Sequence, residues 1–294
     1  MQKTGRAVLV PCAVVVGILL ALAGRAQAPP DPVAALSEIN KWYSDQIKQA
    51  RDNKTPLDIN ALLAERKAKA AAALKDADPA KTDPAKCLAL AQLYQIVQQN
   101  KEALAAAQRY LTSNPEPALK YTAQQIALNG YQSLGDADGI LKTLDEMKPT
   151  IPQMAANLAS STAQQYAMTV ADKKGLQAGL DLIKKMEGQV PFDQFKTVQE
   201  KNIADSTIAG LALGRSALYE KAGKHAEALA ALDEGVKKLG PGNRYASLLE
   251  SKLKLARIPG SPAPELKMDR HYGDFKDLAS LKGKVVVLDF TAHW

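Results

Sequence analysis

The sequence YEKAGKHAEALAALDEGVKKLGPGN, residues 219–243, carries the clearest structural signal in the chain. Tyr219 is followed nine residues later by Ala228, with Gly223 between them. After this glycine, apolar residues recur at the spacing of one helical face, and Gly240 ends the pattern. The stretch therefore predicts two helices joined by a short turn, with the large tyrosine packed over the small alanine.

Parts of this pattern recur earlier in the chain. Tyr94 is followed nine residues later by Ala103, and Tyr131 is followed four residues later by Gly135. Tyr94, Tyr131 and Tyr166 are 37 and 35 residues apart, close to the repeat of about 34 residues in tetratricopeptide proteins. The stretch quoted above resembles that family most closely, and the one at Tyr94 less closely. A helical array without true repeat ancestry is the alternative.

The composition and the positions of helix-breaking Pro and Gly residues extend the helical prediction to residues 29–256. Aromatic residues make up only 5% of the chain, which favours helices packed through small side chains over a β-sandwich. Asp83 followed by Pro84 is a typical helix start, and further Pro and Gly residues divide the region into short segments. We expect a mainly α domain, a tetratricopeptide-like array of antiparallel helical hairpins with a concave face for a peptide or protein.

The N-terminus has the features of a secretory signal. Lys3 and Arg6 precede an uncharged apolar run to Ala23, and small-residue cleavage motifs end at Ala23 and at Ala28. We therefore assign residues 1–28 to a signal peptide cleaved at position 23 or 28, and expect the bacterial periplasm or cell envelope as the location. The alternative is an uncleaved anchor, which would be the protein's one contact with a membrane.

Charge and residue usage exclude several function classes. The net charge of +7 falls to +4 without the three basic residues of the signal, and there is no basic cluster interleaved with aromatics, so we expect no nucleic-acid partner. Three His and two Cys lie far apart, so we expect no metal site. No Gly-rich phosphate loop or catalytic Ser/His/Asp grouping occurs, and we expect no cofactor.

Cys87 is the only cysteine that remains after removal of the signal, so the chain can form no internal disulfide. Leu90, Tyr94 and Val97 follow it at helical spacing, which places these residues on one face. We expect a buried, inert thiol. The alternative is a reactive thiol activated by the helix start at Asp83.

The character of the sequence changes after residue 256. Residues 257–264 contain three prolines within six residues and predict a non-helical linker. In residues 265–294, the run Val285–Phe290 is the one strong strand candidate, and its β-branched residues are typical of a strand buried on both faces.

Three motifs follow one another near the C-terminal end, PGSPAPEL, DLASLKGK and VVVLDFTAHW. Their order resembles the opening of the thioredoxin-fold domain in exported thiol–disulfide oxidoreductases of the TlpA/ResA type. In that family a redox Cys-x-x-Cys follows, and this chain supplies every element up to Trp294 but not the nucleophilic cysteine pair. The resemblance implies that Asp289 is a buried proton acceptor and that Thr291, His293 and Trp294 flank the active site. A solvent-facing carboxylate at Asp289 and an exposed loop residue at His293 are the alternatives.

These features predict the N-terminal portion of an exported thiol–disulfide oxidoreductase, whose redox domain begins, incompletely, in residues 265–294. Its partners would be protein thiols and disulfides, and the chain as given would be inactive in disulfide exchange. The alternative is a non-enzymatic exported helical-repeat protein that binds a peptide or protein partner.

Overall fold

A computed structural model describes residues 30–257, 277 and 279–286. Over these residues the chain is helical and contains no strand, so the predicted mainly α class is confirmed for this part. The α-helices are α1 (Pro32–Asp52), α2 (Ile59–Ala73), α3 (Cys87–Ile96), α4 (Asn100–Leu111), α5 (Pro117–Leu134), α6 (Ala137–Glu146), α7 (Pro152–Ser161), α8 (Ala167–Lys174), α9 (Leu176–Glu187), α10 (Val198–Lys221), α11 (His225–Leu239) and α12 (Arg244–Ala256). The short helices are η1 (Pro84–Lys86), η2 (Thr162–Tyr166), η3 (Phe192–Gln194) and η4 (Ala279–Leu281).

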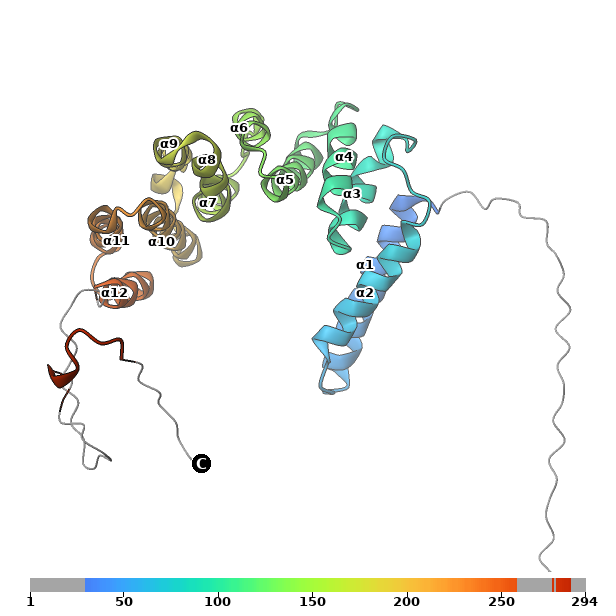
Figure 1. Cartoon of the computed structure of the whole chain (residues 1–294). Coiled ribbons are helices and arrows are strands. Elements are labelled where there is room, and N and C mark those ends of the chain that lie inside the picture. Colours follow the sequence, from blue (N-terminus) through green and yellow to red (C-terminus); the bar gives the residue numbers. More distant parts are fainter. Residues whose placement is uncertain (1–29, 258–276, 278, 287–294) are drawn as a thin grey trace, which may run out of the picture.

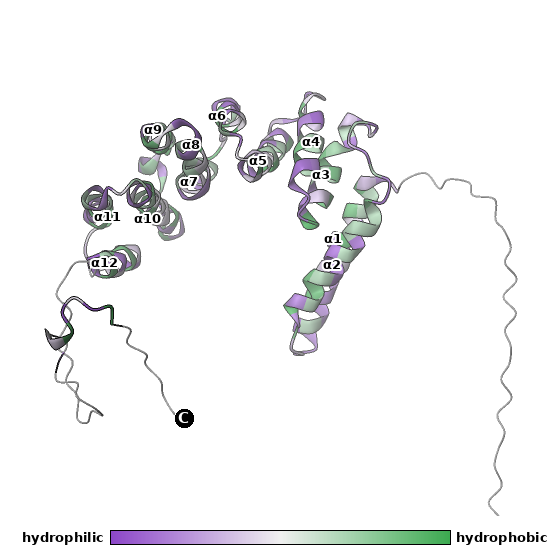
Figure 2. Ribbon diagram, in the orientation of Figure 1, coloured by the Kyte–Doolittle hydropathy of each residue, from purple (hydrophilic) through white to green (hydrophobic). Residues whose placement is uncertain are grey.

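The helices form an arch with two layers (Figure 1). The inner layer contains α5, α7, α10 and α12, and the outer layer contains α6, α9 and α11. Contacts along the inner layer run from α3 to α5, from α5 to η2, from α7 and η2 to α10, and from α10 to α12. Most helices also pack on their neighbours in sequence, as expected for successive helical hairpins, whereas α6 packs on α5 and α8. Both hydrophilic and hydrophobic residues lie on each helix (Figure 2), as this two-layer packing requires.

Three hairpin turns have the same backbone structure. In each, a tyrosine lies four residues before a residue in the left-handed region, and the tyrosine carbonyl accepts a 2.9 Å hydrogen bond from the N–H five residues later. This bond from C″ to C3 is the mark of a Schellman motif, which ends the first helix and reverses the chain. The tyrosine and the left-handed residue, with its φ, are Tyr94 and Gln98 (63°), Tyr131 and Gly135 (67°), and Tyr219 and Gly223 (71°).

Packing beside these turns follows the expected large-over-small arrangement. The ring of Tyr131 lies so close to Gly139 that a Cβ atom built there would be 2.3 Å from the tyrosine Cδ1. Ala103 and Ala228, which follow their tyrosines by nine residues, are buried. Small residues at these positions therefore allow the second helix of each hairpin to approach the first.

Tyr166 does not occupy the equivalent place, although its spacing from Tyr131 predicts that it should. It ends η2, a π-helical turn between α7 and α8, and the hairpin turn comes nine residues later at Gly175 rather than four. A π-helical turn inserts an extra residue into a continuous helix and shifts the register of the side chains that follow. The turn of this hairpin therefore lies farther from its tyrosine than in the other three hairpins, and the expected repeat is broken there.

The helical pair α1–α2 extends away from the arch and is held at its base (Figure 1). Ile39 of α1 and Ala70 of α2 pack with Leu93 of α3 in one buried cluster. Asp31 caps α1 and forms an ion pair with Lys86, with 3.1 Å between Oδ2 and Nζ. The pair is thus attached to the rest of the array through α3.

Much of the remaining prediction lies outside the described residues. This is true of the signal peptide (1–28), of the 257–264 linker except Arg257, and of most of residues 265–294. Within the last segment, Ala279–Leu281 forms a short 3-10 helix. Val285 and Val286, the described part of the predicted strand, are in no strand and are 97% and 41% exposed.

We expect Gly214→Ala to lower the free energy of unfolding by about 1–3 kcal/mol, because the added methyl group overpacks the contact between α10 and η2. A Cβ at Gly214 would lie 2.4 Å from the backbone oxygen of Ala163. The matched control is Gly188→Ala, whose Cβ would meet nothing closer than 3.5 Å, at φ −64°. Urea unfolding followed by circular dichroism measures both variants, and equal midpoints would contradict this account of the helix contact.

Candidate binding surface

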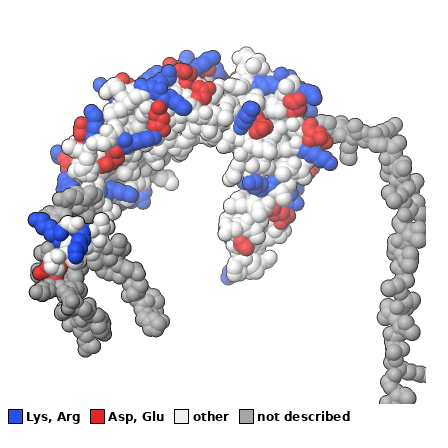
Figure 3. Space-filling model, in the orientation of Figure 1, with Lys and Arg blue, Asp and Glu red and all other residues white. Residues whose placement is uncertain are grey.

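The inner layer exposes uncharged polar side chains. α5 packs against α4 and α6 on one side and has α3 and η2 at its flanks, so its exposed side faces the inside of the arch. No charged residue occurs in residues 121–135 or 149–171, which include most of α5 and all of α7 and η2. In Figure 3, Lys, Arg, Asp and Glu gather along the outer edge of the arch, whereas the edge beneath α5 and α7 is largely uncharged.

We call the exposed and half-buried amide and hydroxyl residues of this inner face the amide stripe. Its members share two properties, a neutral side chain with hydrogen-bonding atoms and a place on an inner helix. They are Thr122, Gln125 and Asn129 on α5, Asn157, Gln164 and Gln165 on α7 and η2, and Gln199, Asn202 and Ser206 on α10.

A buried tyrosine fixes the orientation of one member of the stripe. The Tyr166 hydroxyl in η2 donates to Oδ1 of Asn129 on α5 over 2.9 Å. Burial raises the pKa of Tyr166 to about 12, so this hydroxyl keeps its proton at neutral pH. Because the carbonyl oxygen of Asn129 accepts this bond, its Nδ2 group, which has no acceptor among residues 30–257, is available to a ligand.

Close packing brings the α7–η2 part of the stripe against α10. The Gln164 amide nitrogen donates to Ser160 Oγ over 2.8 Å. Both side chains contact α10 at Gly210, where a Cβ would lie 2.6 Å from Ser160 Oγ and 2.8 Å from Gln164 Nε2. Together with the bond between Tyr166 and Asn129, this contact makes the stripe continuous across three helices.

An open pocket of about 690 Å³ lies between the N-terminal parts of α7, α10 and α12. Gln153, Gln199, Asn202 and Ser206 contribute amides and a hydroxyl to its wall. The charged groups beside it already have partners. The Glu200 carboxylate accepts from the N–H groups of residues 196 and 197, and Arg244 lies over the Tyr245 ring at 4.6 Å. The pocket therefore continues the amide stripe at one end.

A second open pocket, of about 520 Å³, lies among α10, α11 and α12. Its floor is apolar, with Leu213 and Leu232, and Lys252 lies on its wall. Nδ1 of His225 lies 2.8 Å from Oε1 of Glu220 at the same pocket. Ser216 also lines this pocket, but in the described part of the chain no hydrogen bond joins its hydroxyl to His225, so these side chains do not form the contact between nucleophile and base that nucleophilic catalysis uses.

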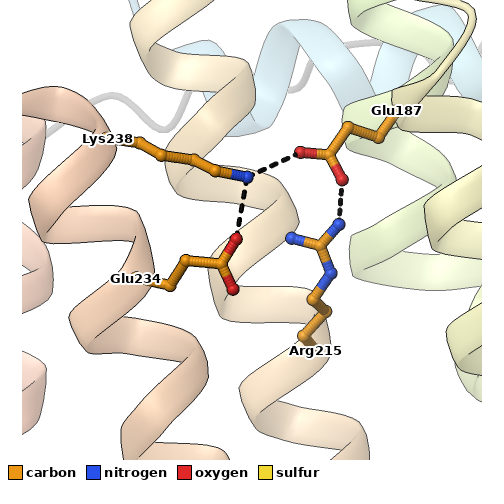
Figure 4. Close-up of polar contacts among 4 residues, drawn as sticks. All are labelled: Glu187, Arg215, Glu234 and Lys238. Atoms are coloured by element: carbon orange, nitrogen blue, oxygen red, sulfur yellow. Dashed lines mark hydrogen bonds and ion pairs between the residues drawn. The ribbon is translucent and has the colours of Figure 1, made fainter.

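An ion-pair cluster joins α9, α10 and α11 (Figure 4). The Glu187 carboxylate pairs with Arg215 and, at 3.2 Å, with Lys238, whose Nζ also lies 2.8 Å from Glu234 Oε1. The hydrogen bond from Lys238 holds the pKa of Glu234 below its usual value. Every charge here has a partner of opposite sign, so the cluster connects the three helices.

Cys87 begins α3 and is fully buried. Its Sγ lies 3.3 Å from the carbonyl oxygen of Asp83, to which the thiol donates. Burial raises the pKa of this thiol, and the nearby Arg109 opposes the shift only in part. The structure therefore confirms the predicted buried thiol, and the activating effect expected of a helix start is outweighed by desolvation.

The residues that the sequence singled out for catalysis, Asp289, Thr291, His293 and Trp294, lie outside the described residues. Within the described part, no three His, Cys, Asp or Glu side chains are grouped to bind a metal ion. No described helix is both long enough and apolar enough to cross a bilayer. The sequence reasoning did not find the amide stripe, although the two charge-free segments that form most of it are visible in the sequence.

No protein-family model matches the chain, and comparisons with curated proteins and with solved structures also found no match.

We expect a thiol reagent to label Cys87 about a hundred-fold more slowly in the native protein than in urea, since access requires a local opening of about 3 kcal/mol. The measurement uses Cys12→Ala, in which Cys87 is the single thiol. The control is Cys12→Ala/Cys87→Ala/Ala230→Cys, which places a thiol on the exposed side of α11. Equal labelling rates for these two proteins would contradict the buried thiol.

Proposed function

We propose that the helical array of residues 32–256 is a binding module that holds an extended segment of another polypeptide along its inner face. The observation that carries this proposal is the separation of side-chain types, with charge on the outer edge and the amide stripe inside the arch. The repeated tyrosine turns support a tetratricopeptide-like array, and arrays of stacked hairpins use their concave face for binding.

The rigidity of the inner face supports the same proposal. Gly210 and Gly214 hold α10 against η2 and α7, and the cluster around Glu187 connects α9, α10 and α11. A surface that is formed before binding loses less conformational entropy when a ligand arrives. This array can therefore bind a flexible chain without first ordering itself.

A photo-crosslinking amino acid at position 125 of the full chain is expected to capture reduced and alkylated lactalbumin, an unfolded polypeptide. The same group at position 177, on the exposed side of α9, is expected to capture none, because Gln177 belongs to the outer layer. Native lactalbumin serves as the folded control. Equal capture at both positions, or none at position 125, would reject binding on the inner face.

A second proposal concerns the chain as part of a larger exported protein. We propose that residues 265–294 begin a thioredoxin-like domain of a periplasmic or cell-envelope thiol–disulfide oxidoreductase, and that the array presents a protein substrate to it. The ordered motifs PGSPAPEL, DLASLKGK and VVVLDFTAHW support this proposal. In disulfide exchange, a thiolate attacks the substrate disulfide, one substrate sulfur leaves as a thiolate, and a second thiol resolves the mixed disulfide. Asp289 would accept the proton of that resolving thiol.

We expect insulin reduction with dithiothreitol to be catalysed only by a form that continues past Trp294 through a Cys-x-x-Cys sequence. The present chain has only Cys12 and Cys87, which form no Cys-x-x-Cys sequence, and it is expected to add nothing to the uncatalysed rate. In the longer form, Asp289→Asn should lower the rate, and Asp277→Asn is the matched surface control. Coding sequence without two such cysteines after Trp294 would reject the redox proposal.

A further inference from the structure

We infer that the amide stripe recognises the main chain of an extended, uncharged polypeptide segment, and that it tolerates different side chains in that segment. This inference rests on the proposed binding function and specifies the class of ligand. The stripe offers amides and hydroxyls from α5, α7–η2 and α10 on one continuous surface.

The chemistry of the stripe matches a peptide backbone. A side-chain amide carries both a donor and an acceptor, as does each non-proline peptide unit, so the two groups can pair in both directions. Charged ligands are bound by opposite charge, yet α5 has no charged residue after Lys120, and α7 and η2 have none. On α10, the carboxylates of Glu200 and Asp205 already accept hydrogen bonds within the chain, and Lys201 is exposed beside the stripe. The neutral stripe therefore favours a neutral partner that is rich in amides.

Asn129 is already oriented for this role. Its Oδ1 accepts from the buried Tyr166 hydroxyl, which directs the two donors of Nδ2 away from the helix contact. A fixed donor loses little rotamer entropy on binding a carbonyl oxygen of the ligand. Tyr166 is thus a positioning residue for Asn129.

The dimensions of the stripe define the length of the ligand. Packed helices lie about 8–10 Å apart, so a chain that crosses α5, η2 and α10 spans about 18 Å between the outer two. An extended chain rises about 3.3 Å per residue, and about six residues therefore cover the stripe. The open pocket of about 690 Å³ at the α7–α10–α12 end has room for side chains of the next residues.

Fluorescence anisotropy of the full chain with a synthetic peptide tests the inference. The peptide has about twelve residues of Ala, Ser, Gln and Val, with blocked ends and a dye, which is enough to cover the stripe. We expect a scrambled peptide to bind within about twofold, whereas methylation of alternate backbone nitrogens should weaken binding at least about tenfold by removing donors. Raising NaCl from about 50 to about 500 mM should change the affinity less than about twofold.

Variants of the protein provide the second part of the test. Gln125→Ala/Asn129→Ala/Asn157→Ala should weaken binding at least about tenfold, since each substitution removes one amide. Gln177→Ala, which removes an exposed amide from α9 instead, should leave the affinity unchanged. Tyr166→Phe should lower the affinity less than Asn129→Ala and have no further effect in the Asn129→Ala background. Circular dichroism and urea unfolding check that each variant is folded.

The outcomes separate this inference from the proposed function. Loss of binding on scrambling, or insensitivity to N-methylation, would overturn main-chain recognition while the inner face remains a binding surface. Tighter binding of a peptide of the same length that contains Lys and Glu would likewise overturn the recognition of an uncharged main chain. Failure of every peptide, together with failure of crosslinking at position 125, would reject both the inference and the proposed function.

Discussion

The separation between neighbouring helices is set at crossing points where one helix contributes no side chain. Gly139 lies beneath the ring of Tyr131, and Gly214 lies against the backbone of Ala163. A methyl group at either place would meet atoms closer than 3.0 Å, so the helices would have to move apart. This close packing holds the helices in two layers, and the layers in turn determine which residues face the inside of the arch.

Much of the fold could be predicted from local sequence, because a hairpin is a local structure. The pattern from Tyr219 to Gly240 correctly predicts α10, α11 and the turn between them. The spacing from Tyr131 to Gly135 likewise predicts the turn between α5 and α6. The search for a glycine at each turn was incomplete at Gln98, which has the left-handed conformation although it is not a glycine. The same reasoning was wrong at Tyr166, because nothing in the tyrosine spacing reveals the π-helical turn that precedes the reversal at Gly175.

The candidate site was harder to predict than the fold. Reasoning from the sequence looked for charged, metal-binding or nucleophilic groups, and Cys87 was the one such residue whose surroundings the structure describes. The amide stripe depends on side chains from helices far apart in sequence, such as Asn129 and Tyr166, whose bond joins α5 to η2. Their proximity follows from the stacking of hairpins, and helical periodicity within one segment contains no information about it.

The contacts among helices α3 to α12 run mainly between neighbours in the arch. In such an arrangement, a gene can gain or lose one hairpin while the packing of the others is preserved. The hairpin formed by α7 to α9 contains the π-helical turn η2 and is accommodated by its neighbours on both sides. Each added hairpin would lengthen the inner face by one helix, so under the proposed binding function the length of the bound segment would change in steps of about three residues.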